Sequence, residues 1–184
     1  MPNLRPLRDY DEKNVINLYT FSGQTSTTQV INKGTLVSAV GDGWRSDTEP
    51  VEMLGSYGDF STNNVQAQRY GTPAKASYAG TGATSYPIGI TLFDVRELDE
   101  NGIPLKYNPR KAAELEACIS GQTVPILTKG TILYSGVTGT IVPGAPAYAG
   151  VSGTIVKDGP GATVGHFLGV TGADGSCLIR LNVI

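Results

Sequence analysis

The stretch VTGTIVPGAPAYAGVSGTIVKDGPGATVG, residues 137–165, contains one six-residue phrase twice. Val-Thr-Gly-Thr-Ile-Val at 137–142 returns as Val-Ser-Gly-Thr-Ile-Val at 151–156. Short β-branched runs bounded by glycine are typical of short strands separated by tight turns. Two copies are too few for a solenoid, which needs at least three stacked units. The repeat therefore predicts two successive strands, and a second echo, NKGTLV at 32–37 and TKGTIL at 128–133, predicts a corner that is made twice.

The composition around the repeat continues this pattern. Glycine accounts for 24 of 184 residues, and charged residues make up only 16% of the chain, against averages of about 7% and about 25%. The length suits a single domain whose core needs no disulfide. The net charge of −2 provides no basic field for nucleic acid, and no apolar run reaches the length of a membrane span. We therefore expect neither a nucleic-acid partner nor a membrane partner.

Further β-branched and aromatic runs on both sides of the repeat predict additional strands. One covers 15–21, and the segment 29–44 reads as two strands joined at a turn. The segment 86–107 reads as a strand that turns at Asp-Glu-Asn-Gly, residues 99–102, and returns. Asn-Gly between apolar segments is a strong hairpin signal. A last strand follows the Asp174–Gly175 turn, so strands are expected along most of the chain.

One segment has a helical pattern instead. NPRKAAELEACI, residues 108–119, starts with Asn108 as an N-cap and Pro109 at the first helical position, and Gly121 follows its end. This pattern predicts a helix of about three turns. The predicted fold is therefore mainly β: a β-sandwich or partly open β-barrel with one short α-helix at about 108–119 and an extended N-terminal arm.

The N-terminal arm is expected to cover residues 1–23, in front of a single β-rich domain over 24–184. Two prolines disfavour a helix in the arm, whose apolar and arginine side chains alternate. With no core of its own to enter, the arm is expected to be mobile in the isolated subunit and to become ordered against a neighbour. Packing back on its own domain as an edge cover is the alternative. The candidate contact residues, which include two from the loop GDGWRSD, are Leu4, Arg5, Leu7, Arg8, Tyr10, Trp44 and Arg45.

No residue pattern predicts catalysis, a cofactor or a metal site. His166 is the only histidine, and its setting is that of a residue on a strand face. Cys118 and Cys177 lie far apart, outside any metal-binding spacing, and we expect buried free thiols, with a disulfide as the alternative. Asp99 and Glu100 are the only credible acid–base candidates, but the hairpin turn explains them. We therefore expect a protein that is not an enzyme and that has no catalytic, cofactor-binding or metal-binding residues.

The C-terminal part of the chain carries a set of strand-and-turn phrases in a definite order. GAPAYAG at 144–150 is followed by TVGHFLG at 163–169 and by ADGSCLIRLNV at 173–183. This order resembles the C-terminal pattern of small decoration, or cement, proteins of tailed bacteriophage capsids. YPIGITLFDV at 86–95 is similar to an upstream strand of the same proteins. The resemblance lies mostly within residues 124–184, whereas the arm, the GDGWRSD loop and the helical segment depart from the family pattern.

The resemblance implies a structural virion protein. Members of that family sit outside the mature shell, commonly as trimers at three-fold and quasi-three-fold positions, and clamp neighbouring capsomers against internal DNA pressure. For this chain it implies the outer surface of the capsid as location, the major capsid protein as partner, a homotrimer, and stabilisation of the shell. Low charge and many small residues are compatible with dry subunit packing. The alternative is another virion β-module, such as a head-fibre base or a carbohydrate-binding domain, with Tyr70, Tyr78 and Tyr86 as a sugar-binding stripe.

Overall fold

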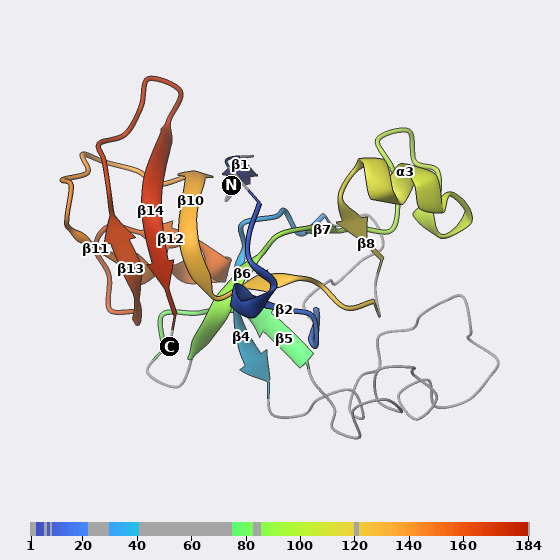
Figure 1. The fold of residues 1–184 in the computed structure, drawn as a ribbon, viewed down its shortest axis with the longest axis horizontal. Coiled ribbons are helices and arrows are strands. Elements are labelled where there is room, and N and C mark those ends of the chain that lie inside the picture. Colours follow the sequence, from blue (N-terminus) through green and yellow to red (C-terminus); the bar gives the residue numbers. More distant parts are fainter. Residues whose placement is uncertain are drawn as a thin grey trace.

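The computed structural model describes residues 3–5, 7, 9–21, 30–40, 75–82, 86–119 and 122–183. Over these residues the chain is mainly β and forms two six-stranded sheets and a two-stranded ribbon (Figure 1). Each large sheet keeps two edge strands, so the architecture is a partly open β-sandwich rather than a closed barrel. The predicted fold class is therefore confirmed.

The first sheet, named sheet A, is antiparallel throughout. Five of its six strands come from the C-terminal part of the chain, and the sixth is the N-terminal strand. In spatial order the strands are β1 (Asn3–Arg5), β10 (Lys129–Ser135), β14 (Ser176–Asn182), β13 (Thr163–Phe167), β11 (Pro146–Ala149) and β12 (Ile155–Val156).

The second sheet, named sheet B, contains one parallel pair at its edge, β3 with β5, and is otherwise antiparallel. The run 15–21, predicted as one strand, forms two short strands at opposite edges of this sheet. In spatial order the strands are β2 (Val15–Ile16), β9 (Ile126–Leu127), β6 (Pro87–Thr91), β4 (Leu36–Val40), β5 (Lys75–Tyr78) and β3 (Thr20–Phe21). The separate parallel ribbon is β7 (Asp94–Val95) with β8 (Ala117–Cys118).

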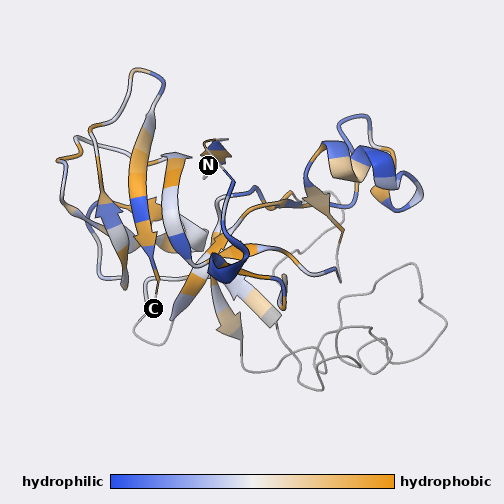
Figure 2. Cartoon of the chain, in the orientation of Figure 1, coloured by the Kyte–Doolittle hydropathy of each residue, from blue (hydrophilic) through white to orange (hydrophobic). Residues whose placement is uncertain are grey.

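The core consists of two hydrophobic clusters on opposite faces of sheet B. Successive residues of one strand point to opposite faces, so Leu36 and Leu127 enter the cluster shared with sheet A. Their neighbours Val37 and Ile126 enter the second cluster. Sheet A contributes only one face to the core, and buried and exposed residues accordingly alternate from Cys177 to the end of β14, a strand that carries both hydrophobic and hydrophilic bands (Figure 2). The other face of sheet A remains on the surface.

The predicted helix begins where expected and ends early. In α3 (Pro109–Glu114) the side chain of Asn108 accepts a hydrogen bond from the backbone N–H of Lys111 at 3.2 Å, as expected of an N-cap. The extension to residue 119 is wrong. Glu116 adopts a left-handed conformation with φ 49°, and the chain then enters β8 beside β7. Pairing with a distant strand therefore overrides the local helical preference.

The two copies of the six-residue repeat have the same glycine conformation and a buried isoleucine at the same position, but only the second copy forms a strand. Gly139 and Gly153 both have positive φ, at 91° and 71°, a conformation that glycine adopts without strain. Ile141 and Ile155 follow them and are both buried. Ile155 lies in β12, which pairs with β11, whereas residues 137–142 form a connection outside the strands. The prediction of two strands is therefore half right.

The second echo marks two different structures. Lys33 and Gly34 form a turn before β4, as predicted. Lys129 and Gly130 instead open β10, directly after Thr128, where the chain passes from sheet B to sheet A. The predicted turn at 129–130 is wrong because antiparallel pairing with the end of β14 keeps both residues extended. Among the described residues, the short 3-10 helices are η1 (Glu12–Asn14), η4 (Leu105–Tyr107) and η5 (Val151–Gly153).

Candidate functional site

The described part of the N-terminal segment is extended, but it is built into the domain. Strand β1 pairs with β10 at the edge of sheet A, with Leu4 opposite Tyr134. Leu4 is 7% exposed, and its backbone N–H donates to the carbonyl of Lys33 at 3.2 Å. The expectation that this segment has no core to enter is wrong, because pairing with β10 buries Leu4. Strand β10 lies far away in the sequence, and nothing in the N-terminal segment identifies it as the partner. The alternative, in which the segment packs back on its own domain as an edge cover, is what residues 3–5 do. The proposed boundary between residues 23 and 24 lies outside the described residues.

Four of the candidate contact residues converge on one cleft of about 590 Å³. The N-terminal segment supplies one wall, and the other wall comes from the turn before β4, the connection between β6 and β7, and the residue before β8. The candidates that line it are Leu4, Arg5, Leu7 and Tyr10, and the opposite wall is formed by Lys33, Leu92, Phe93 and Glu116.

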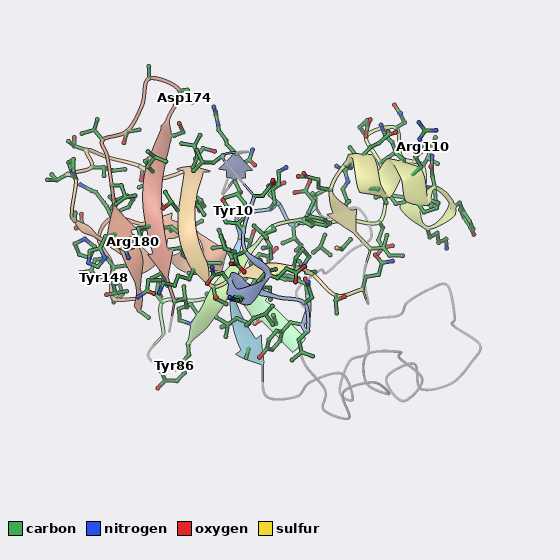
Figure 3. The ribbon with its side chains drawn as sticks, in the orientation of Figure 1. Tyr10, Tyr86, Arg110, Tyr148, Asp174 and Arg180 are labelled. Atoms are coloured by element: carbon green, nitrogen blue, oxygen red, sulfur yellow. The ribbon has the colours of Figure 1, made fainter. Side chains whose placement is uncertain are left out.

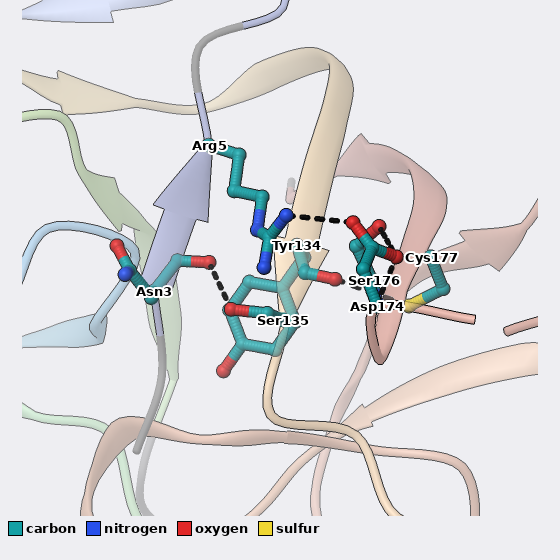
Figure 4. A network of polar contacts seen from close by, with 7 residues as sticks. All are labelled: Asn3, Arg5, Tyr134, Ser135, Asp174, Ser176 and Cys177. Carbon is teal, nitrogen blue, oxygen red and sulfur yellow. Dashed lines mark hydrogen bonds and ion pairs between the residues drawn. The ribbon is translucent and has the colours of Figure 1, made fainter. Parts of the chain in front are cut away.

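The two cations that line this cleft are paired within the chain, whereas the exposed carboxylate of Asp9, which also lines it, has no ion pair within the described residues. Lys33 Nζ lies 2.6 Å from a carboxylate oxygen of Glu116. The guanidinium of Arg5 lies 2.6 Å from a carboxylate oxygen of Asp174 (Figure 4). Beside this ion pair, the hydroxyl of Ser135 donates a hydrogen bond to the carbonyl of Asn3. Both pairs are partly exposed, and such pairs contribute at most about 1 kcal/mol. The cleft therefore offers apolar side chains and one unpaired carboxylate, but no unpaired cation.

Asp174 also orders the turn that precedes β14. Its carboxylate accepts hydrogen bonds from the hydroxyl and the backbone N–H of Ser176, at 2.7 and 3.1 Å. These bonds, with a smaller effect of the Arg5 guanidinium, hold the pKa of Asp174 below its usual value. One carboxylate therefore fixes the predicted Asp174–Gly175 turn and also holds the end of β1.

Tyr10 and Leu7 differ in how they stand in the cleft. The hydroxyl of Tyr10 donates to the carbonyl of Thr131 at 3.4 Å, and its ring lies against Gly130, so Tyr10 fastens the segment beside β10. Leu7 is 43% exposed and is available to a partner. The other candidates, Arg8, Trp44 and Arg45, lie outside the described residues.

The acid–base candidates are engaged in local structure. The Asp99 carboxylate accepts from the backbone N–H groups of Ile103 and Asn101, each at 2.8 Å. These bonds, Ile103 first, lower the pKa of Asp99, and the turn at 99–102 is the predicted one. Glu100 pairs with Lys111 at 2.7 Å, which lowers the pKa of the Glu100 carboxyl. The returning strand predicted after this turn is absent from the described residues: a single bridge between Leu98 and Pro104 closes the turn, and the chain then enters η4. Both carboxylates are therefore explained by the turn and by its attachment to α3.

The two thiols lie in different hydrophobic clusters, Cys118 in one and Cys177 in the other. Both are free and buried, as expected, and burial raises the pKa of each to about 11. Thiols with such pKa values are inert at neutral pH. Within the described residues no group of three His, Cys, Asp or Glu side chains is placed to hold a metal. None of the helices described here is long and apolar enough to cross a membrane.

The proposed tyrosine stripe is not assembled by the residues that can be placed. Tyr78 packs edge-on against Phe21, with ring centroids 5.0 Å apart, and so belongs to the packing of sheet B. Tyr86 is 75% exposed, and Tyr70 lies outside the described residues. The glycan-binding alternative therefore gains no support from these side chains.

No protein-family model matches the chain, and no curated protein matches it. Sequence reasoning also passed over one surface, the outward face of sheet A, which carries Leu168, Leu178 and Arg180. The signal was present in SCLIRLN, residues 176–182, because strict alternation places Leu178 on the same side as Arg180 rather than in the core.

Proposed function

We propose that the chain is a structural virion protein that binds the outside of a phage capsid and stabilises the shell. The observation that carries the proposal is that the segment of the sequence that resembles decoration proteins forms most of a single sheet, sheet A. Residues 124–184, which hold most of the resemblance, supply five of the six strands of sheet A, and the three phrases that resemble decoration proteins form β11, β13 and β14 of that sheet. A continuous antiparallel sheet with one face on the core is a rigid platform, which suits a protein that must hold neighbouring shell subunits at a fixed separation.

The N-terminal segment adds a second feature that suits attachment. Its β1 end is anchored through Leu4, whereas Leu7 reaches the cleft with 43% of its surface exposed. The apolar side chains of the cleft can receive an apolar side chain of a partner, and the cations beside them are already paired, so no unpaired cation is desolvated. We propose the major capsid protein as that partner, and a homotrimer as the form that binds it.

The test is a binding titration on intact shells. Purified protein is mixed with shells that lack it, assembled from the major capsid protein of the same virus, and the bound fraction is measured by sedimentation. The expected result is saturation at a fixed copy number per three-fold position, with a trimer found by analytical ultracentrifugation of the free or shell-bound protein. Protease accessibility on intact particles is expected to place the bound protein outside. Absence of co-sedimentation, or binding that never saturates, would remove the proposal.

A further inference from the structure

The outward face of sheet A combines exposed leucines with unpaired cations. This outer face is defined by the side chains of β10, β14, β13 and β11 that point away from the core. Burial alternates along β14, where Leu178, Arg180 and Asn182 are exposed and their neighbours are buried. The residues opposite them in the sheet register share the same face. All of these strands lie in the described part of the chain.

Three leucines stand side by side on the outer face, one in β10, one in β14 and one directly after β13. Leu133 is opposite Leu178 in the β10–β14 register. On the other side, the backbone N–H of Leu168 donates to the carbonyl of Leu178 at 2.8 Å. Leu168 is 48% exposed and Leu178 is 37% exposed, while Leu133 is half-buried. Contiguous exposed apolar side chains on a soluble protein mark an interaction surface more often than isolated ones do.

Cations without carboxylate partners border this leucine row. Arg180 lies between Thr131 and His166 in the register, and Lys129 lies on the same face opposite Asn182. No ion pair involves Arg180 or Lys129 within the described residues. The outward residues of β10, β14, β13 and β11 include no carboxylate. The outer face is therefore positive on a chain whose net charge is −2.

The ion pair at the rim of the outer face, between Arg5 and Asp174, does not cancel the positive charge of that face. Arg5 is opposite Leu133 and reaches Asp174 in the turn before β14. Asp174 is thereby occupied by Arg5 and by Ser176. Its carboxylate is already neutralised, so the charge of Arg180 and Lys129 is left for an external group.

We propose that the outer face of sheet A docks onto a protein surface that presents an apolar patch bordered by carboxylates. This inference rests on the proposed function, under which that surface is the exterior of the shell protein. A second copy meeting it face to face is disfavoured, because like cations would oppose each other and no carboxylate would lie between them. The cleft beside the N-terminal segment lacks this charge excess, since its cations are paired within the chain.

The test compares charge-reversed and acid-substituted variants in the shell-binding titration. Arg180→Glu and Leu178→Glu are expected to weaken binding by about tenfold or more, as expected of interface anchors. The matched controls are Arg110→Glu, on α3 at the opposite end of the molecule (Figure 3), and Ile103→Glu, directly after the turn at 99–102. Both control side chains are exposed, and these variants are expected to bind within about twofold of wild type.

Additional readouts separate docking from misfolding. The milder variants Arg180→Gln and Leu178→Ala are expected to keep the wild-type thermal midpoint and still to bind more weakly. Binding of the wild type is expected to weaken with added salt, and this dependence is expected to be smaller in Arg180→Gln.

The outcomes distinguish this inference from the proposed function. If wild-type protein does not bind shells, the proposed function fails. If wild type binds and all outer-face variants bind equally well, the function stands and the inference is overturned. If the variants lose self-association while monomers still bind shells, the outer face is an interface between copies and the inference is likewise overturned.

Discussion

Replacing Leu4 by alanine tests whether the N-terminal segment is part of the folded core. Leu4 is 7% exposed and belongs to the same hydrophobic cluster as Tyr134 and Leu36. Truncation of a buried leucine typically costs about 2–5 kcal/mol, and the cost is smaller where neighbours can close the gap. Strand β1 is a three-residue edge strand that can shift inward. The free energy of unfolding is therefore expected to fall by about 2–3 kcal/mol.

Leu7→Ala is the matched control, with the same chemistry in the same segment. Leu7 is 43% exposed, and surface substitutions usually change stability by less than about 0.5 kcal/mol. Deletion of residues 1–13 removes both Leu4 and Tyr10 and is expected to destabilise the domain at least as much as Leu4→Ala. Deletion of a free arm would instead leave the stability of the domain unchanged.

The assay is urea unfolding followed by far-ultraviolet circular dichroism. A shift of the midpoint at constant slope reports a change in stability rather than in the surface exposed on unfolding. The reasoning would be refuted if Leu4→Ala and Leu7→Ala unfolded at the same midpoint. That outcome would place Leu4 outside the core and restore a mobile N-terminal arm.

Three further predictions concern the sandwich itself. Gly165→Ala is expected to lower the free energy of unfolding by about 3 kcal/mol or more, because the added Cβ would lie 2.1 Å from the carbonyl oxygen of Arg180. Gly169→Ala is the control, since a Cβ at that position meets no atom within 4 Å and is expected to change stability little. Tyr134→Phe is expected to cost about 1–3 kcal/mol, since the buried N–H of Ile155 loses its acceptor at 3.1 Å. Burial raises the pKa of Tyr134 from 10.0 to about 12, so its stabilising effect is complete below pH 10 and is lost as the pH rises through 12.

Urea unfolding at several pH values measures all three effects. Equal midpoints for Gly165→Ala and Gly169→Ala would contradict the close approach of β13 to β14. The raised thiol pKa values start the alkaline loss of stability near pH 9, and Tyr134 adds to it above pH 10. In Tyr134→Phe the loss above pH 10 is expected to be shallower, and an unchanged slope would show that this phenol is not buried.

Features set by neighbouring residues could be predicted from the sequence. The Asn108 cap and the turns at 99–102 and before β14 depend on side chains that bond to backbone groups two to four residues away. Such turn chemistry is local and can be recognised in a short segment. The alternation along β14 is equally local, and it predicts which residues of that strand face outward.

Features set by distant pairing could not be predicted. Leu4 is buried because β1 meets β10, and nothing in residues 1–13 identifies that partner. The helix ends at Glu114 because the following residues are needed in β8 beside β7. The run 15–21 divides between two sheet edges for the same reason. The cleft depends on these long-range pairings, so the sequence supplied four of its residues as candidate contacts but neither their placement together nor the opposite wall.

The most direct test of the central claim is the mechanical effect of the protein on shells. Shells with and without saturating protein are heated or exposed to falling ionic strength, and rupture is followed by release of packaged DNA. Decorated shells are expected to rupture at a higher temperature than bare shells, with the gain rising in proportion to occupancy and reversing when the protein is removed. Identical rupture temperatures at full occupancy would contradict a stabilising role for the bound protein.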